Sequence, residues 1–449
     1  MNYTEFRKLV ESAAKARGLD KYDLYYSAFE SVQAEAFRHE IKQVESSTEG
    51  GVCFRCIANG RMGYASTESL CASEAGRIVE KAYENALSLE SDEKEFIAPS
   101  GGEYANAIPG EDSLESTEDI VAKALEGQKA LYAADEAVVD GSETAVMTGR
   151  KVIALANSNG LDLYREYTAS GLYTAAVVSN GNEMKDCYEI RTGRLDTIDV
   201  ADAANKAAAA AKAKIGSGPA PTGVYPVVFD PKAFASLLAA FSPVFSSDNV
   251  RKGLSLLAGK EGEVIASEAV TVTDDPFFKE AAMPMNFDAE GTPAYKKNVV
   301  ENGVLKTLLY NLKTAEALGK KTTGNASRAS FSAPVGVSPF TLYVAPGKAS
   351  EEELIAKAGN GVYIDGLGGL HAGVDTVSGD FSLQSEGFMI ENGKKTKAVS
   401  SFTVAGNFFT LLKSVTDVSD TVKTEAFGLS STAFASPAVL VEKLSIAGK

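Results

Sequence analysis

Apolar residues in the first 20 positions recur at the spacing of one face of a helix. They are Phe6, Leu9, Val10, Ala13 and Ala14. This i, i+3, i+4, i+7 pattern predicts an amphipathic helix docked on a core. Charged residues are spread through the same segment, so it lacks the uninterrupted apolar stretch of a signal peptide.

Strand-like and helix-like patterning then alternate up to residue 214. Strands are predicted where aromatic and β-branched residues stand between polar or glycine-containing breaks, in 22–66, 151–158 and 161–179. Helices are predicted where apolar residues recur at helical spacing, at about 68–89 and 116–134. The alanine-rich run 201–214 is predicted as a third helix, because Asp202 near its start and Lys212 near its end complement the helix dipole.

Two segments have compositions that resist regular structure. Residues 96–112 are rich in Gly, Pro and Ala without any period, which indicates a linker or a long loop. Residues 215–223, IGSGPAPTG, form the clearest linker. A chain of 449 residues has room for two or three domains of about 150 residues. We therefore expect an N-terminal region 1–217, with a candidate sub-boundary within 96–112, and a C-terminal domain 222–449.

Asn-Gly pairs, the preferred residues of two-residue β-hairpin turns, recur along the chain. They begin at residues 59, 159, 180, 302, 360 and 392. The pairs at 302 and 392 stand between apolar and mixed segments, as hairpin tips do. So many hairpin signals beside helices predict an α+β fold, with antiparallel strands and helices in the N-terminal region and a larger C-terminal domain rich in antiparallel β-hairpins.

The net charge of the chain limits the classes of partner that it is expected to bind. Lys and Arg number 44 and Asp and Glu number 60, which gives a formal net charge of −16. Such an acidic chain repels phosphate backbones, so direct binding of nucleic acid is not expected. No apolar run approaches the ~18 residues that span a bilayer, so we expect no membrane association and a cytoplasmic protein. The four cysteines are expected to be reduced and mostly buried.

The familiar metal-binding and catalytic motifs are incomplete. The two histidines, His39 and His371, exclude three-His zinc sites and two-His motifs at close spacing. His39-Glu40 begins like a metalloprotease helix motif, but no second histidine follows and the segment has the pattern of a polar strand. Cys53 and Cys56 stand three apart on a predicted strand, where they face opposite sides of the sheet and cannot chelate one ion together. The sequence therefore assigns no catalytic residue, metal ligand or cofactor to this chain.

The segment 364–395 concentrates glycines, a histidine and several acidic residues. Its candidate functional residues are His371, Asp375 and Asp380, which could converge in a substrate pocket beside the glycine-rich backbone or form a weak metal site. The alternative is a set of tight turns between strands, with His371 bonded to backbone.

Long stretches of the chain resemble the TldD/PmbA family, whose members are often labelled modulators of DNA gyrase. They include FDAEGTPAYKKNVVENGVLKTLLYNLKTAEALGKKTTGNASR and GLGGLHAGVDTVSGDFSLQSEGFMIENGKKTKAVSSFTVAGNFFTLL. In the N-terminal half, GVCFRCIANGRMGYAST resembles the first strand-turn segment of the family. Within the family, the chain is most similar to the PmbA (TldE) branch.

The resemblance implies a subunit without zinc of its own. TldD-type chains carry an HExxxH helix and a distant cysteine that bind zinc for peptide hydrolysis. At the corresponding place this chain has KAFASLLAAFSPVFSS, without histidine, and no cysteine follows Cys187. The resemblance thus implies a non-catalytic partner that joins a zinc-bearing TldD-type subunit, or forms a homodimer when alone. It would shape a shared cavity for peptides, where strand addition could hold an extended substrate.

Two other functions stay open at this point. The chain could be a binding or regulatory protein that acts on gyrase or another target without peptide hydrolysis. It could also be a stand-alone enzyme that uses His371, Asp375 and Asp380.

Overall fold

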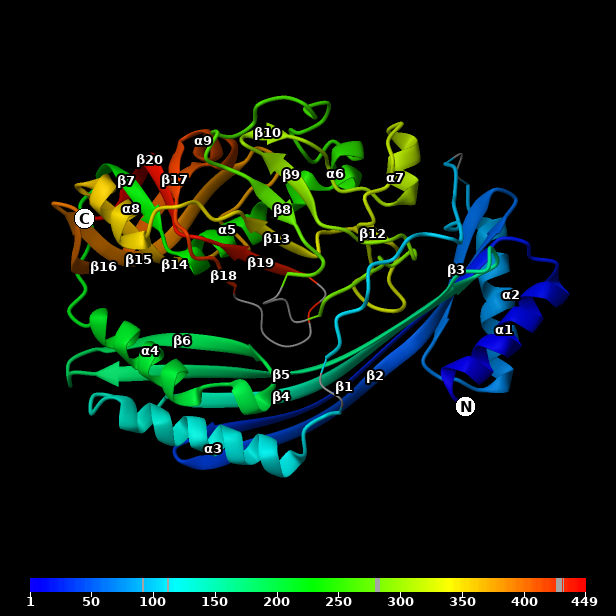
Figure 1. The fold of residues 1–449 in the computed structure, drawn as a ribbon, viewed down its shortest axis with the longest axis horizontal. Helices are drawn as coiled ribbons and strands as arrows, with labels where there is room; N and C mark the ends of the chain where they lie inside the picture. The colour runs from blue at the N-terminus through cyan, green and yellow to red at the C-terminus, as the bar shows by residue number, and fades with distance from the viewer. Residues whose placement is uncertain (91–92, 111–112, 279–282, 425–429, 431) are drawn as a thin grey trace.

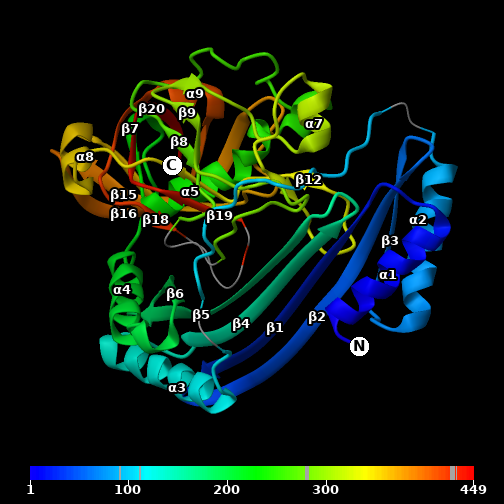
Figure 2. The same cartoon turned by 45° about the vertical axis from the view of Figure 1, so that its right-hand side comes forward.

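The computed structural model describes residues 1–449 except 91–92, 111–112, 279–282, 425–429 and 431. The described residues form three six-stranded sheets and one two-stranded ladder. Figures 1 and 2 both show a long N-terminal sheet passing beneath a C-terminal domain, which holds the other sheets. The predicted α+β fold is confirmed.

The N-terminal sheet has the strand order β3-β2-β1-β4-β5-β6, and all of its neighbouring strands are antiparallel. β2 alone has 19 residues, which at about 3.3 Å per residue makes a ribbon about 60 Å long. The strands are β1 (Tyr22–Phe37), β2 (Glu40–Ala58), β3 (Arg61–Thr67), β4 (Glu143–Asn157), β5 (Asp162–Ser179) and β6 (Met184–Gly193).

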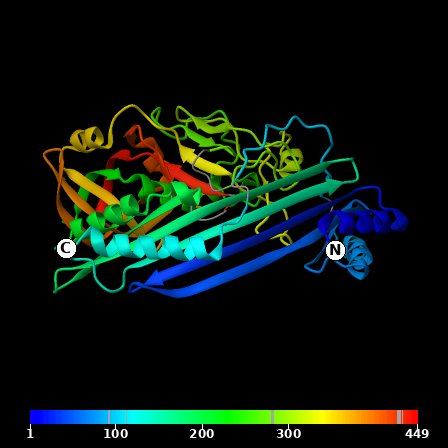
Figure 3. The ribbon, with the colours of Figure 1, turned by 60° about the horizontal axis from the view of Figure 1, so that its bottom comes forward.

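Helices cover one face of this sheet, and the C-terminal domain covers the other. Leu24 and Ala34 of β1 share the helical face because they are an even number of residues apart. Leu24 packs with α1 and α2, and Ala34 packs with α3 and α4. Tyr25 points to the opposite face and packs with Met285 and Phe287 of the C-terminal domain. Figure 3 shows α3 in front of the strands. The helices are α1 (Tyr3–Arg17), α2 (Ala72–Ser88), α3 (Thr117–Ala134) and α4 (Val200–Ala213).

The predicted N-terminal helix is confirmed as α1. Phe6, Val10 and Ala14 are fully buried, whereas Leu9 is 39% exposed. The buried stripe is therefore narrower than the apolar pattern. Asn2 caps the helix, since its side chain accepts a hydrogen bond from a backbone N–H of the first turn.

The C-terminal domain contains two six-stranded sheets. The first has the order β16-β15-β14-β7-β20-β17 and closes into a small barrel because β16 also pairs with β20. Its strands are β7 (Gly223–Phe229), β14 (Gly361–Gly368), β15 (Asp380–Glu391), β16 (Lys394–Asn407), β17 (Val415–Val418) and β20 (Val439–Ala447). The second has the order β10-β9-β8-β13-β19-β18. Its strands are β8 (Val272–Asp274), β9 (Lys297–Glu301), β10 (Val304–Leu305), β13 (Thr341–Val344), β18 (Lys423–Thr424) and β19 (Ala433–Ser436).

Shorter elements complete the domain. A two-stranded ladder pairs β11 (Ala326–Ser327) with β12 (Gly336–Val337). The helices are α5 (Pro231–Phe241), α6 (Ser247–Arg251), α7 (Leu312–Ala317), α8 (Glu351–Ala358) and α9 (Phe408–Lys413). The domain is not purely antiparallel, since β7 pairs in parallel with β14 and β13 pairs in parallel with β19.

The hairpin signals are correct at most positions but not at all. Asn302 and Asn392 occupy hairpin tips with positive φ angles of 47° and 52°. Asn360-Gly361 instead leads from α8 into β14, so the hairpin expected there is wrong. The pattern also predicts no strand at 184–193, where β6 lies at the sheet edge, because its mostly half-exposed residues lack an apolar alternation.

The predicted linkers contain no helix or strand over 96–110 and 215–222, whereas Gly223 already begins β7. Residues 111–112 lie outside the described residues. Both linkers are nevertheless packed. Ala98 is buried, and its carbonyl oxygen accepts a hydrogen bond from the Asn157 side chain at 2.8 Å. Gly218 exchanges backbone hydrogen bonds with Ala398 and Ser400 beside β16. No helix among the described residues is long and apolar enough to cross a membrane.

Candidate functional site

Helix α5 follows β7 at the place where the family resemblance puts a zinc-binding helix. Asp230 caps its N-terminus by accepting a hydrogen bond from the backbone N–H of Lys232 at 2.8 Å, and Pro231 occupies its first turn. Phe234 and Phe241 are at most 1% exposed. A 3-10 helix over Ser242–Phe245 ends the segment. In this chain α5 is therefore an apolar helix of the core.

A cleft of about 380 Å³ lies at the C-terminal end of α5 and is called the α5 cleft below. On the helix side it is lined by Ser242, Pro243, Ser246, Asp248 and Asn249. The β11–β12 ladder and the residues around it form the other wall.

The residues around the α5 cleft do not fit a zinc ion. Asp248 is the single carboxylate of the lining, and it pairs with Lys252 Nζ at 2.6 Å. Neither histidine nor cysteine lines the cleft. Zinc in proteins takes imidazole, thiolate and carboxylate ligands in sets of three or four. Among the described residues, no group of three or more such side chains could hold a metal ion.

A smaller pocket of about 70 Å³ adjoins this cleft and is called the Arg328 pocket. The sheet contributes Tyr25, Ser27, Lys151 and Ile153 to its lining, and the C-terminal domain contributes Asp288, Arg328 and Phe340. Both hollows share Ser327, Ala329, Ser338 and Pro339. The small pocket therefore borders the α5 cleft, and it lies at the seam between the long sheet and the C-terminal domain.

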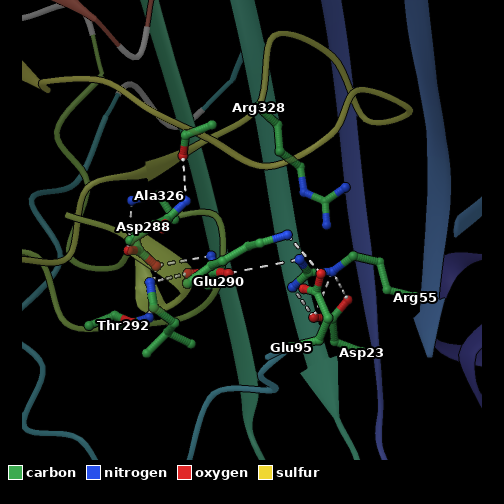
Figure 4. A network of polar contacts seen from close by, with 12 residues as sticks. Asp23, Arg55, Glu95, Asp288, Glu290, Thr292, Ala326 and Arg328 are labelled. Carbon is green, nitrogen blue, oxygen red and sulfur yellow. Dashed lines mark hydrogen bonds and ion pairs between the residues drawn. The ribbon is translucent and has the colours of Figure 1, made fainter. Parts of the chain in front are cut away.

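A buried ion-pair network lies close to the Arg328 pocket (Figure 4). Arg55 of β2 binds Asp23 of β1 through Nε, at 2.8 and 3.0 Å from the two carboxylate oxygens, and through Nη2. Its Nη1 lies 3.8 Å from Glu290 of the C-terminal domain. Glu290 also accepts a hydrogen bond from the backbone N–H of Leu312 at 2.9 Å. The network joins the sheet to the loop that borders the pocket.

Asp288 holds that loop through its backbone. One carboxylate oxygen accepts N–H bonds from Glu290 and Thr292, and the other accepts the N–H of Ala326, all at 2.9 Å. Burial, followed by the charge of Glu290, raises the pKa of Asp288. Its side chain therefore shapes the pocket wall and has its acceptor positions engaged.

A second buried cluster anchors the segment that carries Arg328. Asp274 accepts hydrogen bonds from the side chain of Asn325 at 2.7 Å and from Lys297 Nζ at 3.0 Å. Asp274 and Asn325 are fully buried. Farther along, the Phe331 ring lies against Gly51 of β2, where an added Cβ would come within 2.5 Å of the ring. Both contacts fix the position of Arg328.

A cleft of about 560 Å³ lies elsewhere, between α4–β6 and β14–β15. Lys214 Nζ lies 2.5 Å from Glu386 and 3.5 Å from Asp365. Burial raises the pKa of Asp365 to about 6, against the opposing effect of Lys214. Burial also raises the pKa of the Cys187 thiol, so this cysteine lacks the thiolate character of a nucleophile.

The structure places the three predicted site residues on the surface. His371, Asp375 and Asp380 are all exposed, and none of them lines the α5 cleft, the Arg328 pocket or the cleft of about 560 Å³. Asp375 accepts backbone N–H bonds from Val377 and Ser378, and Asp380 accepts a bond from the Asn407 side chain at 2.9 Å. These contacts hold the connection before β15, and the proposed contact with substrate stays a prediction.

The surroundings of His39, Cys53 and Cys56, the other residues considered from the sequence, indicate structural roles. His39 lies in the β1–β2 turn with a φ of 66°, not within a strand, and its ring is 4.1 Å from that of Tyr132. Cys53 and Cys56 are buried free thiols. Sequence reasoning missed Arg328 and Lys151. Arg328 ends the long stretch that carries the family resemblance, which was the available signal.

The fold and the clefts define a class of protein: an α+β chain whose long sheet is seated against a barrel-containing domain, with a cleft beside α5 that has no zinc ligands. Family models described as the PmbA/TldA metallopeptidase domain 1, central domain and C-terminal domain match residues 22–86, 111–215 and 222–448. The chain belongs to the PmbA/TldD family.

Relatives cover nearly the whole chain. A metalloprotease of Methanothermobacter thermautotrophicus is 30% identical over 84% of this chain and 83% of its own length. The metalloprotease PmbA of Escherichia coli O157:H7 is 23% identical over 86% of this chain and 84% of its own. A Thermotoga maritima structure described as a DNA gyrase modulator has a TM-score of 0.89 and 30% identity, covering 99% of this chain and 100% of that one. TldE from Thermococcus kodakarensis has a TM-score of 0.88 and 25% identity, covering 98% and 99%.

Proposed function

We propose that this chain is a PmbA/TldE-type subunit of a cytoplasmic peptide-processing complex. It would shape the peptide cavity while a TldD-type partner supplies zinc and performs hydrolysis. The observation that carries the proposal is the combination of a formed cleft at the end of α5 with a lining that cannot hold zinc. The metalloprotease relatives and the TldE neighbour support the peptide-processing assignment.

The C-terminal domain forms the walls of the α5 cleft, and the long sheet adds a wall to the adjoining Arg328 pocket. Buried ion pairs and backbone-bound carboxylates fix both walls before any ligand arrives. A preformed cavity loses little conformational entropy on binding, which favours capture of an extended peptide. In this proposal the exposed loop with His371, Asp375 and Asp380 contacts the substrate or the partner within the assembled complex.

Reconstitution tests the proposal. The chain is co-expressed with the TldD-type subunit of the same genome, with an affinity tag on one of the two, and peptide digestion is compared for each subunit and for the pair. We expect the subunits to elute together and the pair to cleave faster than the partner alone. A partner whose HExxxH histidines are replaced by alanine is the control and should leave the pair inactive. Failure to assemble, or hydrolysis by this chain alone, would contradict the proposal.

A gyrase regulator is the second candidate, favoured by the description of the Thermotoga relative. The net charge of −16 makes direct binding of DNA unfavourable, so such a regulator would have to contact the enzyme. Co-elution of the purified chain with gyrase, together with a changed supercoiling rate, would support this function over peptide processing.

A further inference from the structure

Two guanidinium nitrogens of Arg328 are buried without an acceptor. Nη1 donates to the carbonyl oxygen of Ala333 at 3.2 Å, but Nε and Nη2 have no hydrogen-bond partner in the described part of the chain. Nε and Nη2 form one edge of the guanidinium group, whose parallel N–H bonds match the two oxygens of a carboxylate. Buried donors are rarely left unpaired in folded proteins, so this edge suits a ligand.

Elsewhere in this molecule, a carboxylate binds the same Nε–Nη2 edge of another arginine, Arg55. Its Nε and Nη2 both donate to the carboxylate of Asp23. In Figure 4, dashed lines join Arg55 to Asp23. The nearby Glu290 is already engaged by Arg55 and by the N–H of Leu312. The guanidinium of Arg328 lies over the Tyr25 ring, 4.8 Å from its centroid, and no carboxylate among the described residues accepts a hydrogen bond from its Nε–Nη2 edge.

Lys151 brings a second cation to the same pocket. It lies on β4, and burial lowers the pKa of its amine with no acidic neighbour to oppose that effect. Asp288 also lines the pocket, but both of its oxygens are engaged by backbone N–H groups. An anion in the pocket would give Lys151 a counter-charge and the Nε–Nη2 edge of Arg328 an acceptor.

The size of the pocket limits the ligand. Its volume of about 70 Å³ is far below the volume of about 380 Å³ of the α5 cleft and is several times the roughly 10–15 Å³ that one water molecule needs, so the pocket suits a small terminal group such as a carboxylate. It borders the α5 cleft, with which it shares four lining residues. We propose that the Arg328 pocket binds the C-terminal carboxylate of a peptide whose preceding residues lie in the α5 cleft. The proposal rests on the proposed function and names the end of the peptide that this subunit holds.

Binding of labelled peptides to the full chain alone tests this inference. One peptide is prepared in three forms. The first has a free C-terminal carboxylate and the second has a C-terminal amide. The third also has a C-terminal amide, but its last residue is a glutamate, so that its only carboxylate near the end is a side chain. Affinities are measured by fluorescence anisotropy for the natural chain and for Arg328→Gln, Lys151→Met and Arg150→Gln. Arg150 is the matched control, because it neighbours Lys151 on β4 but forms exposed ion pairs with Glu30 and Glu166 on the opposite face.

We expect the free acid to bind about 10- to 100-fold more tightly than the amide, the range that charged hydrogen bonds provide. Arg328→Gln should remove this preference, Lys151→Met should reduce it, and Arg150→Gln should keep it. Equal binding of acid and amide, or a preference that persists without Arg328, would overturn the inference. Equally tight binding of the glutamate-containing amide would overturn the assignment to the peptide terminus.

The two proposals can fail separately. The binding measurement needs neither the partner nor hydrolysis. Equal affinity for the free acid and the amide would therefore refute the assignment of the Arg328 pocket without contradicting the proposed complex. A chain that selects free acids but never assembles with a TldD-type subunit would refute the proposed function instead. If Arg328→Gln melts well below the natural chain, Lys151→Met, which removes no hydrogen bond among the described residues, decides the outcome.

Discussion

Asp23 and Arg55 face each other across the β1–β2 ladder and form a buried bidentate ion pair. Asp23 is 1% exposed and Arg55 is 2% exposed. The same guanidinium also lies 3.8 Å from Glu290 of the C-terminal domain. One arginine therefore compensates carboxylates from both parts of the chain.

Replacing Arg55 should lower the stability of the folded chain. Arg55→Met leaves the buried Asp23 without its cation and removes one of the two arginine charges that act on Glu290. We expect the free energy of unfolding to fall by about 3–5 kcal/mol. Urea denaturation measures the change. Arg150→Met, which breaks exposed pairs on the same sheet, should cost at most about 1 kcal/mol. Equal losses in both variants would show that burial of the Arg55 pair does not matter.

Asp365 should make stability depend on pH. Burial raises its pKa to about 6 in the folded chain, above the ordinary value of about 3.9. Its contribution is therefore fully present below about pH 4 and is lost as the pH rises through about 6. Asp365→Asn stays neutral, so between pH 4 and 7 it should lose roughly 2–3 kcal/mol less stability than the natural chain.

Thermal and urea denaturation at several pH values check this difference. Asp375→Asn is the control with the opposite sign, because N–H bonds from Ser378 and Val377 lower the pKa of the Asp375 carboxyl. Its contribution is present at neutral pH and is lost as the pH falls through its lowered pKa. Identical pH profiles for the natural chain and Asp365→Asn would contradict the prediction.

The purified chain alone should hold no stoichiometric zinc. The α5 cleft offers one carboxylate, already paired with Lys252, and neither imidazole nor thiolate. Elemental analysis of the chain after metal-free purification measures the content. About one equivalent of zinc that disappears in His371→Ala would show that the exposed loop binds metal and would refute the expectation.

The exposed segment from His371 to the first residue of β15, Asp380, can be tested with two variants. His371 makes no hydrogen bond within the described part of the chain, so His371→Ala should leave the melting temperature unchanged. Asp380→Ala loses the bond from Asn407 and should cost at most about 1 kcal/mol. If the loop contacts substrate or partner as proposed, both variants lower peptide cleavage by the reconstituted pair. Unchanged cleavage in His371→Ala would remove the loop from the site.

The elements of the fold were largely predictable, because each depends on local periodicity. Helices α1, α3 and α4 lie where apolar or alanine-rich spacing indicates them. The Asn-Gly pairs at 302 and 392 form the expected hairpin tips. Polar edge strand β6 was missed, since an edge strand with half-exposed residues carries no apolar alternation. The parallel pairing of β7 with β14 was also beyond prediction, because the two strands are far apart in the sequence.

The candidate site was predictable only in what it lacks. The sequence shows that no histidine or cysteine follows β7 at the place of a zinc-binding helix, since an absent ligand type needs no structure to be recognised. The segment 364–395 is unusual in composition, because it concentrates glycines, a histidine and several acidic residues. Composition could not show that His371, Asp375 and Asp380 are exposed and lie outside the clefts.

The sequence by itself determined the α+β class, the family and the absence of zinc ligands at α5, because these depend on local patterns and on residue types. Only the tertiary structure decided that Lys151 and Arg328, from distant segments, share one small pocket. It also decided that Asp23 neutralises Arg55 while the matching edge of Arg328 has no acceptor among the described residues. Burial and charge compensation depend on neighbours that folding brings together. No local sequence pattern therefore shows that a carboxylate of the chain binds the Nε–Nη2 edge of Arg55 and that none among the described residues binds that of Arg328.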